Sequence, residues 1–433
     1  MSDSDLAIVA ALIFAWGALS ARLERFEVTA PITFVGAGLV LTHGPLAPLG
    51  VQPSREMIKA LAEITLVLVL FCDASRVGLH GLRADLGLYL RLLGIGLPLT
   101  IALGTLLALA LTGITNIWFA LIVGAALAPT DAALGAGMMA NPVVPARIRR
   151  LINVESGLND GIATPFVSVA LAGAGTAEHV VGITPAVAAA ELALGIVIGV
   201  AVGGAGGVLV NATRRRGWAA EGFAGSAVLA LALCAYACAL ALHGNGFIAA
   251  FTGGLAFGTT GGRRGAPLVP FVEEAGALAS LLVWLAFGAV AVASAFSGLT
   301  WQIIVYAVLS LTVIRMVPVA AALAGARLGW PTVALVGWFG PRGLASVVFA
   351  LLALEELGKT AVGPAVTVIG ITVLLSVIAH GATAEPLADR YAAVLAPAVG
   401  GQAHAEQPDL PVRKLIRHTG AAARRPGAAS KPT

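Results

Sequence analysis

Apolar runs of about 18 or more residues follow one another along nearly the whole chain of 433 residues. Glycine, proline and charged residues separate these runs. Runs of this length cross a lipid bilayer as helices, so the pattern predicts an all-α polytopic membrane protein. Cutting the chain at the separating residues gives thirteen candidate spans: 6–21, 29–49, 57–75, 86–112, 115–135, 149–173, 184–211, 221–242, 245–260, 270–295, 301–326, 331–354 and 362–385. Because the span 245–260 is short, a count of twelve is the alternative.

The composition agrees with a membrane domain. Hydrophobic residues make up 58% of the chain and charged residues 11%, whereas a soluble domain carries about 25% charged residues. The first apolar run follows Asp3 and Asp5 and has no basic segment before it, so we expect a retained span and not a cleaved signal peptide. The three cysteines show no zinc or disulfide spacing, and we predict no cofactor.

Basic residues are distributed unevenly among the loops. Of the 26 Lys and Arg residues, 21 lie in the odd-numbered loops and the C-terminal tail, and three lie in the even-numbered loops. By the positive-inside rule, this bias places the odd loops and the C-terminus in the cytoplasm and the N-terminus outside. It also explains the net charge of +4 without a nucleic-acid partner. We expect a transmembrane domain over residues 1–396 in the lipid bilayer and a disordered basic tail over 397–433.

Some charged residues are not explained by orientation. Four carboxylates and two guanidiniums lie where the chain is otherwise apolar: Asp73, Asp131, Glu155, Asp160, Arg315 and Arg342. An isolated charge at the centre of a membrane helix costs roughly 2.5–3.5 kcal/mol, so these residues need partners, water or a function. We therefore expect them to form the functional site.

Two of the spans are interrupted at equivalent places. The seventh span divides the others into two groups of six, which makes spans 5 and 12 equivalent and opposite in direction. Span 5 contains Pro129-Thr130-Asp131, and span 12 contains Gly340-Pro341-Arg342-Gly343. Matched breaks of this kind indicate the binding site of an inverted-repeat transporter. Each half-helix leaves backbone amides or carbonyls free to meet an ion.

Helical geometry separates the polar residues of span 6 into two faces. Ser156 and Asp160 are four residues apart and share a face, as do Glu155 and Asn159. Glu155 and Asp160 point in directions about 140° apart. We expect Asp160 and Ser156 to face a cavity, and Glu155 and Asn159 to face protein and a counter-ion. Asp160 would lie about 15 Å into the span, near the bilayer midplane.

The side chains gathered in this way suit a small hard cation. Asp160, Ser156, Asp131, Thr130 and Asp73 supply oxygen ligands, which such cations prefer. No histidine or cysteine joins them in sequence, which disfavours a transition metal. A carboxylate can hold either a proton or a metal cation, but not both. Competition of this kind, exposed alternately to each side of a membrane, is exchange of a cation for a proton.

Several of these residues have structural alternatives. Asp131 could cap a half-helix, and Asp73 could be an interfacial residue at the end of its span. Ser156 and Thr130 could bond to their own helix backbones. For Glu155 we expect an ion pair with an arginine, and we expect Arg315 and Arg342 to be structural counter-ions and not ligands.

These residues resemble the motifs of a known family, the monovalent cation:proton antiporters of the NhaP/NHE type. The matching segments are Ala128-Pro129-Thr130-Asp131, Glu155-Ser156-Gly157-Leu158-Asn159-Asp160-Gly161, Arg315, and Gly340-Pro341-Arg342-Gly343-Leu344-Ala345. The resemblance implies about thirteen helices, with two crossed broken helices in a core domain that includes parts of 57–173 and 270–385. The other helices would form a dimerisation domain, and transport would use an elevator-like movement of the core.

The resemblance also implies roles for individual residues. Asp160 would carry the cation or proton, and Ser156, Thr130 and Asp131 would help to coordinate the ion. Glu155 would pair with Arg315 or Arg342 and so brace the core. Asp73 stands where some relatives place a glutamate ligand. Asn159 stands where electrogenic relatives have a second aspartate, which implies exchange of one cation for one proton. Ala132-Ala133 departs from the Pro-Val of many relatives.

We therefore expect an electroneutral Na⁺/H⁺ antiporter, which also accepts Li⁺, in a cell membrane and as a homodimer. An antiporter that prefers K⁺ or accepts several monovalent cations is the alternative within the same fold. An ion channel and an intramembrane enzyme with an Asp131–Asp160 dyad are rivals from other classes. The dyad would leave Asn159, Arg315 and Arg342 unexplained, so we do not expect an enzyme.

Overall fold

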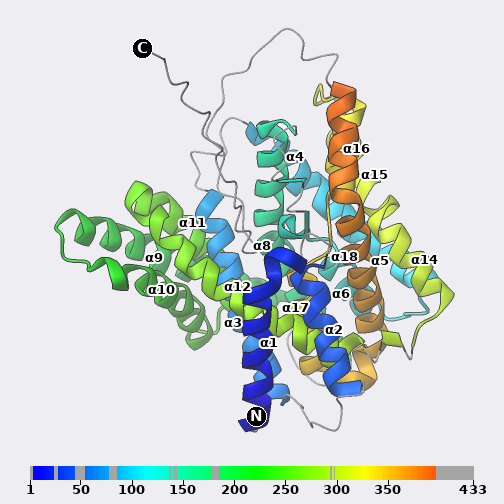
Figure 1. Ribbon diagram of the computed structural model, residues 1–433, viewed down its shortest axis with the longest axis horizontal. Coiled ribbons are helices and arrows are strands. Elements are labelled where there is room, and N and C mark those ends of the chain that lie inside the picture. Colours follow the sequence, from blue (N-terminus) through cyan, green and yellow to red (C-terminus); the bar gives the residue numbers. More distant parts are fainter. Residues whose placement is uncertain are drawn as a thin grey trace, which may run out of the picture.

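The computed structural model of the protein describes residues 3–23, 28–43, 54–77, 85–135, 138–139, 144–177, 185–292, 295–296 and 298–395. Within these ranges every regular element is a helix (Figure 1). This confirms the all-α fold class. The predicted tail, residues 397–433, lies outside the described residues.

Each of the thirteen predicted spans contains one helix or a series of consecutive helices. The first half contains α1 (Asp3–Leu23), α2 (Ala30–His43), α3 (Arg55–Val77), α4 (Leu86–Arg91), the π-helix η4 (Leu92–Gly96), α5 (Leu97–Leu111), α6 (Ile117–Ala126), the short 3₁₀ helix η5 (Ala132–Gly135) and α8 (Ala146–Ala177). The central helix is α9 (Pro185–Arg215). The second half contains α10 (Glu221–Ala241), α11 (Gly246–Gly265), η6 (Ala266–Leu268), α12 (Val269–Phe287), η7 (Gly288–Val292), α14 (Trp301–Leu311), α15 (Val313–Ala322), α16 (Trp330–Trp338), α17 (Leu344–Leu357) and α18 (Lys359–Leu395).

The short span 245–260 is a separate crossing. Gly262, with φ 55° and ψ −147°, breaks the chain between α11 and α12. Glycine tolerates this conformation because it lacks a Cβ. Both α11 and α12 pack against α3, so the chain folds back at this point. The described part of the chain therefore has thirteen segments, in agreement with the predicted number.

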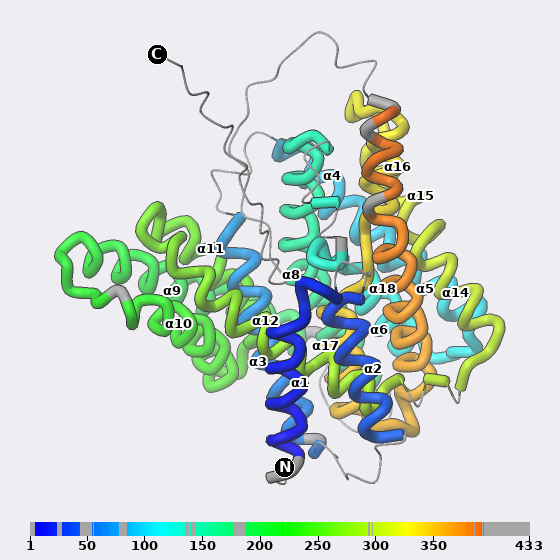
Figure 2. Tube along the Cα trace, viewed as in Figure 1, coloured from blue at the N-terminus to red at the C-terminus, as the bar shows by residue number. Residues whose placement is uncertain are grey.

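The helices form two groups joined by α3. Figures 1 and 2 show α9, α10 and α11 on one side of the molecule and α5, α14, α15, α16 and α18 on the other. The helix α3 packs against α11 and α12 as well as against α8 and α17. A residue on the inner face of α3 therefore lies where the two groups meet.

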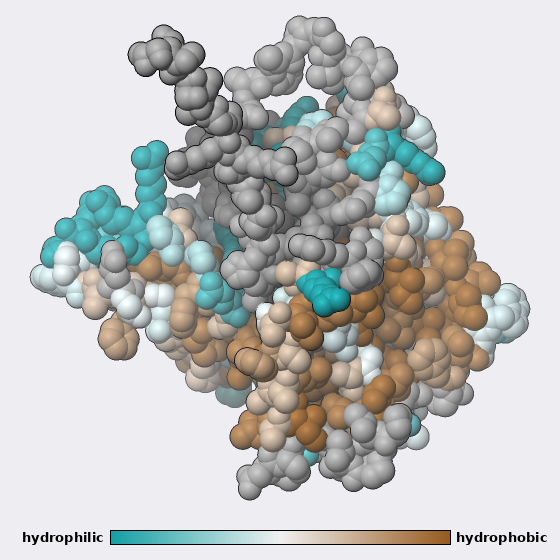
Figure 3. All heavy atoms as spheres, in the orientation of Figure 1, coloured by the Kyte–Doolittle hydropathy of each residue, from teal (hydrophilic) through white to brown (hydrophobic). Residues whose placement is uncertain are grey.

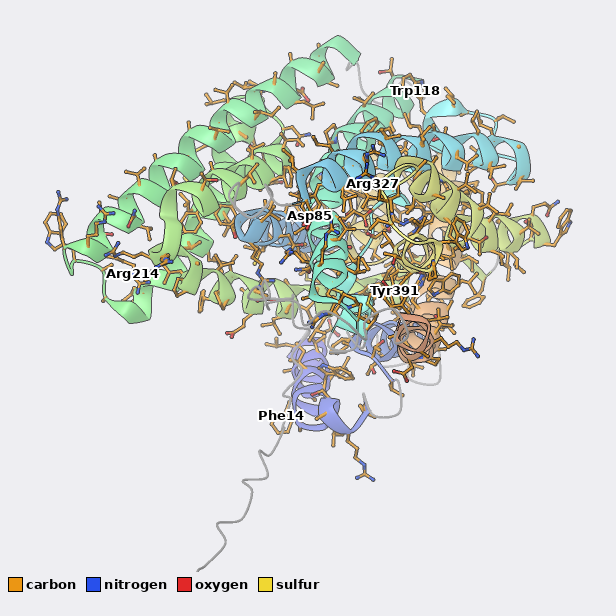
Figure 4. All side chains as sticks on the ribbon, turned by 90° about the horizontal axis from the view of Figure 1, so that it is seen from above. Phe14, Asp85, Trp118, Arg214, Arg327 and Tyr391 are labelled. Carbon is orange, nitrogen blue, oxygen red and sulfur yellow. The ribbon has the colours of Figure 1, made fainter. Side chains whose placement is uncertain are left out.

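The surface is apolar over a wide area, as a lipid-facing surface requires. In Figure 3, hydrophobic residues cover much of the lower and right-hand part of the molecule, and hydrophilic residues gather towards the upper edges. Figure 4 shows Phe14 of α1 at the edge of the molecule, where its side chain is 78% exposed. By length and composition, seven helical stretches of the described chain are long and apolar enough to cross a membrane, and one of them, Gly246–Val292, contains the break at Gly262.

The contact between α9 and α11 depends on a row of glycines. Gly195, Gly199, Gly203 and Gly207 occur at every fourth position of α9 and face α11. A Cβ at Gly203 would lie 2.1 Å from the carbonyl oxygen of Gly253. Small residues at this spacing allow the backbones of membrane helices to approach closely.

We expect Gly203→Ala to destabilise the protein by about 1–3 kcal/mol, because the added methyl group forces the two backbones apart. Gly204→Ala is the matched control, since its Cβ would lie 4.0 Å from the nearest heavy atom, the Cβ of Ala256. That substitution should be neutral or stabilise the helix by up to about 1 kcal/mol. Thermal unfolding of the purified variants in one detergent measures both effects, and equal melting temperatures would contradict the assignment.

Candidate ion-binding site

Two helix breaks meet at the centre of the molecule. The chain is non-helical over residues 127–131, between α6 and η5, and over residues 339–343, between α16 and α17. The backbone N–H of Asp131 donates to the carbonyl oxygen of Pro341 over 2.8 Å. This hydrogen bond joins the two breaks, so the predicted pair of broken helices cross as expected.

A glycine makes this crossing possible. A Cβ at Gly343 would lie 2.2 Å from the Cβ of Asp131, which is shorter than any tolerated contact between carbon atoms. The backbone of the second break, at Gly343, therefore lies as close to Asp131 as a backbone can.

The Asp131 carboxylate stabilises the amino ends of two helical segments. Its Oδ1 accepts a hydrogen bond from the Ala133 N–H over 2.9 Å, at the start of η5. Its Oδ2 accepts from the Leu344 N–H over 3.4 Å, at the start of α17. A carboxylate is favoured at such ends because the backbone N–H groups there lack intrahelical partners. The capping role that the sequence left open for Asp131 is thus present in the structure.

Arg342 stabilises the carboxyl end of a helix. Its guanidinium is fully buried and donates from Nη1 to the carbonyl oxygens of Ala128 over 2.8 Å and Pro129 over 3.4 Å. Its Nη2 donates to the carbonyl of Ser310 over 3.1 Å. Carbonyls that follow the end of α6 lack helical partners, and a cation is favoured beside them. Arg342 of the second break therefore stabilises the first break.

Glu155 pairs with Arg315 and not with Arg342. Nη1 and Nη2 of Arg315 donate to Oε1 and Oε2 of Glu155 over 2.7 and 2.8 Å. The two side chains are 2% and 1% exposed. This bidentate geometry is the strongest form of such a pair. The pair connects α8 to α15 and neutralises the Glu155 charge within the protein.

The other polar face of α8 joins the first break through hydroxyl groups. Nδ2 of Asn159 donates to Oγ1 of Thr130 over 2.7 Å. Thr130 Oγ1 lies 3.0 Å from Ser156 Oγ, and either hydroxyl can donate. Thr130, Ser156, Asn159 and Asp160 are each at most 7% exposed. The position of Asn159 differs from the prediction, because it bonds to Thr130 rather than sharing the counter-ion of Glu155.

The predicted ligand residues surround one cavity. It has a volume of about 30 Å³ and is lined by Asp73, Thr130, Asp131, Ser156 and Asp160, among others. This volume holds one or two particles of the size of a water molecule. The structure therefore brings together all five residues for which the sequence predicts ion contact.

Asp73 reaches the cavity from α3, whereas the other four ligand residues lie on α8 or at the first break. It lies on α3, opposite Gly157 of α8, where an added Cβ would lie 3.4 Å from the Cβ of Asp73. A Cβ at that distance would be in ordinary van der Waals contact, so Asp73 packs directly over this turn of α8. The cavity thus lies at the contact between α3 and α8.

Two charged residues beside the cavity were not predicted as part of the site. Arg76 lines the cavity one helical turn after Asp73, and its guanidinium forms an ion pair with Glu273 of α12. Arg76 could have been predicted from the sequence, because its spacing of three residues from Asp73 places both side chains on one face of α3. No comparable pattern indicates Glu273, which lies 197 residues from Arg76 in the sequence.

An all-helical membrane fold with two crossed helix breaks, and buried carboxylates at the crossing, defines the class of inverted-repeat membrane transporters. Comparison with known proteins makes this more specific. The sequence profile of the family described as "Sodium/hydrogen exchanger, transmembrane" matches residues 8–390. The chain therefore belongs to the sodium/hydrogen exchanger family, which is a family of transporters and not of enzymes.

Solved structures share the fold. The sodium proton antiporter MjNhaP1 from Methanocaldococcus jannaschii at pH 8 superposes with a TM-score of 0.73 at 18% sequence identity, covering 90% of this chain and 98% of that one. An electron-microscopy structure of the same antiporter gives a TM-score of 0.69 at 18% identity, covering 89% and 97%.

Relatives by sequence are uncharacterized Na⁺/H⁺ exchangers of Mycobacterium bovis and Mycobacterium tuberculosis. They are 27% identical over 219 residues, which is 49% of this chain. The match covers 37% of the length of those proteins. The chain thus matches well under half of these relatives.

We expect Glu155→Gln and Arg315→Gln each to lower stability by about 3–5 kcal/mol, because each leaves the other member of the pair charged, buried and unpaired. The double variant should lose less than the sum of the two single losses. Thermal unfolding of the four proteins forms a double-mutant cycle. Additive losses would show that the two side chains do not stabilise one another.

Proposed function

We propose that the protein exchanges Na⁺, and also Li⁺, for H⁺ without net charge movement, at the cavity beside Asp160. The observation that carries the proposal is the gathering of Asp73, Asp131, Asp160, Ser156 and Thr130 around one small cavity at the crossing of the helix breaks. These oxygen ligands suit a small hard cation.

Asp160 is the proposed carrier of the cation or the proton. The Glu155 carboxylate is held by Arg315, and the Asp131 carboxylate is held by two backbone amides. Both are therefore committed to supporting the breaks. Asp160 lines the cavity together with Ser156 and Thr130 and is 7% exposed, so its carboxylate lies where a cation in the cavity would meet it.

Asn159 supports the proposed exchange of one cation for one proton. Its amide donates to Thr130 and adds no charge to the site. With Glu155 neutralised by Arg315, Asp160 then contributes the single carboxylate of α8 that can exchange ions. Loading with either Na⁺ or H⁺ gives the same charge at this residue.

The position of Asp73 supports the proposed elevator-like movement. Asp73 lies on α3, which packs on α11 and α12, while Asp160 and Ser156 lie on α8. We propose a core domain drawn from parts of residues 57–173 and 270–385 that moves against the remaining helices. Sliding of α8 past α3 would separate ligands that come from the two sides of the contact.

We propose further that the protein is a homodimer in a cell membrane, with the N-terminus outside and the C-terminus cytoplasmic. The bias of basic residues towards the odd-numbered loops supports this orientation. The apolar, highly exposed surface of α1, which includes Phe14, is available to lipid or to a second copy of the chain.

In proteoliposomes with an imposed pH gradient, we expect added Na⁺ or Li⁺ to dissipate the gradient through the protein. Asp160→Asn should reduce this flux to that of protein-free liposomes, because the amide cannot exchange a proton for a cation. Asp389→Asn, an exposed substitution on α18, is the matched control and should exchange at the rate of the unchanged protein. Retained exchange in Asp160→Asn would overturn the assignment of the carrier.

The same assay tests the ion and the charge stoichiometry. A larger response to K⁺ than to Na⁺ would identify the K⁺-preferring alternative. Exchange at the same rate with the membrane potential clamped and unclamped is expected for one cation per proton. A rate that changes with the clamp would contradict the electroneutral mechanism, and uncoupled Na⁺ flux would indicate a channel.

We expect Glu273→Gln to raise the apparent KM for Na⁺ on the order of tenfold. Without the Glu273 carboxylate, the Arg76 guanidinium would turn towards Asp73 and the cavity and compete with the cation. Glu274→Gln is the matched control, because Glu274 is the adjacent residue and is exposed. An unchanged KM in Glu273→Gln would show that the ion pair does not hold Arg76 away from the cation.

A further inference from the structure

A buried histidine stabilises the carboxyl end of α16. Nε2 of His380, on α18, lies 2.9 Å from the carbonyl oxygen of Trp338, the last residue of α16. That carbonyl also accepts from the Gly340 N–H over 2.7 Å. The end carbonyls of a helix lack intrahelical partners, so His380 supplies one at the point where the second break begins.

The same histidine connects to the middle of the break through a serine. The backbone N–H of Arg342 donates to Oγ of Ser376 over 2.7 Å. Ser376 lies one turn before His380, and its Oγ is 3.2 Å from Nδ1 of His380. The bonds therefore run from the Arg342 amide through the Ser376 hydroxyl and the imidazole to the Trp338 carbonyl.

The ring of His380 is fixed in place. The side chain is 1% exposed, and its ring stacks on the indole of Trp338 with a centroid distance of 5.1 Å and an angle of 30°. Nε1 of Trp338 donates to Oγ1 of Thr383 over 3.1 Å. The stacked pair thus holds the end of α16 against α18 through both backbone and side-chain contacts.

His380 completes a set of partners for the helix ends at the crossing. Arg342 meets the carbonyls after α6, and Asp131 meets the amides at the starts of η5 and α17. His380 occupies the equivalent position at the end of α16. Of these three side chains, histidine is the type that ordinarily changes charge between pH 5 and 8.

We infer that His380 is a positioning residue for the proposed exchange: through Trp338 and Ser376 it holds the second helix break in the shape that places Arg342 on the first. This inference rests on the proposed function of the neighbouring site. The neutral imidazole with a hydrogen on Nε2 satisfies the bonds of this series, but its Nδ1 then faces the Ser376 carbonyl, 2.9 Å away, without a hydrogen between them. Nε2–H then donates to Trp338, and Nδ1 accepts from the Ser376 hydroxyl while that oxygen accepts from the Arg342 amide.

Protonation of His380 changes this arrangement. A hydrogen on Nδ1 points to the backbone carbonyl of Ser376, which lies 2.9 Å away, and the Ser376 hydroxyl hydrogen loses its acceptor. A second positive charge also appears near Arg342 in the break and Arg315 on α15. Protonation therefore keeps both bonds that reach the break, from the Arg342 amide to Ser376 and from His380 to Trp338. It alters the contacts of Nδ1 and the charge beside Arg342.

Other charged and titratable groups surround this part of the crossing. Glu155 on α8 neutralises Arg315, Asp131 lies ahead of η5, and α14 contributes the Tyr306 hydroxyl, which donates to the Gly104 carbonyl. Of these groups, Glu155 and Asp131 already have the partners described above. The effect of His380 on the break therefore depends on its own contacts with two carbonyls and one hydroxyl.

Hydrogen exchange of the backbone amides tests the positioning role without transport. In the full-length protein in nanodiscs, we expect the Arg342 amide to exchange on the order of tenfold faster in Ser376→Ala and in His380→Ala. His380→Gln should keep most of the protection, because its amide can donate to the Trp338 carbonyl. His43→Gln, an exposed histidine at the end of α2, is the control and should leave the protection unchanged. Equal exchange in all variants would overturn the inference.

The pH dependence of Na⁺/H⁺ exchange at saturating Na⁺ tests the effect of protonating His380. Saturation removes the competition between protons and Na⁺ at the ion site. We expect the maximal rate of the unchanged protein to change over the pH range in which His380 takes up its second proton, and this change to be absent in His380→Gln. His380→Ala should also be slower at neutral pH, on the order of tenfold. If His380→Ala does not fold, His380→Gln and Ser376→Ala carry the test.

The outcomes separate this inference from the proposed function. An unchanged pH dependence in His380→Gln, or a wild-type rate in folded His380→Ala, overturns the inference while Na⁺/H⁺ exchange by the unchanged protein stands. Absence of Na⁺-dependent proton flux in the unchanged protein overturns the proposed function, and the amide measurement then still decides whether His380 and Ser376 hold the break.

Discussion

The structure depends on one constraint: backbone groups that leave a helix inside an apolar membrane domain must find partners. The crossing exposes such groups at the end of α6 and at the starts of η5 and α17. Arg342 and Asp131 satisfy them: the Arg342 side chain acts on the first break, and the Asp131 side chain acts on both. Much of the buried charge in the chain is therefore needed to keep two helices broken at the same place.

The Glu155–Arg315 pair adds a second requirement. A buried ion pair contributes little to stability compared with apolar residues of the same volume. The pair is better explained by the orientation that it imposes on α8. It fixes the rotation of α8 relative to α15 and turns the opposite face, with Ser156 and Asp160, towards the cavity. The division of α8 into a supporting face and an ion-facing side follows from this orientation.

The sequence predicted the spans, both breaks and the two faces of α8, because each depends on local spacing. Hydrophobic length, proline and glycine positions and the helical repeat are all visible in one segment of chain. The choice of Arg315 over Arg342 for Glu155 was not predictable, because both arginines lie within spans and the three-dimensional distance decides. Glu273 was missed for the same reason, since no local pattern connects it with Arg76.

The contact between Gly343 and Asp131 restricts how such a chain can evolve. The space that a Cβ at position 343 would need is already filled by the Asp131 side chain. A larger residue at 343 therefore requires a smaller residue, and the loss of a helix cap, at 131. In chains that cross their helices in this way, the two positions should vary together or not at all, even though 212 residues separate them in the sequence.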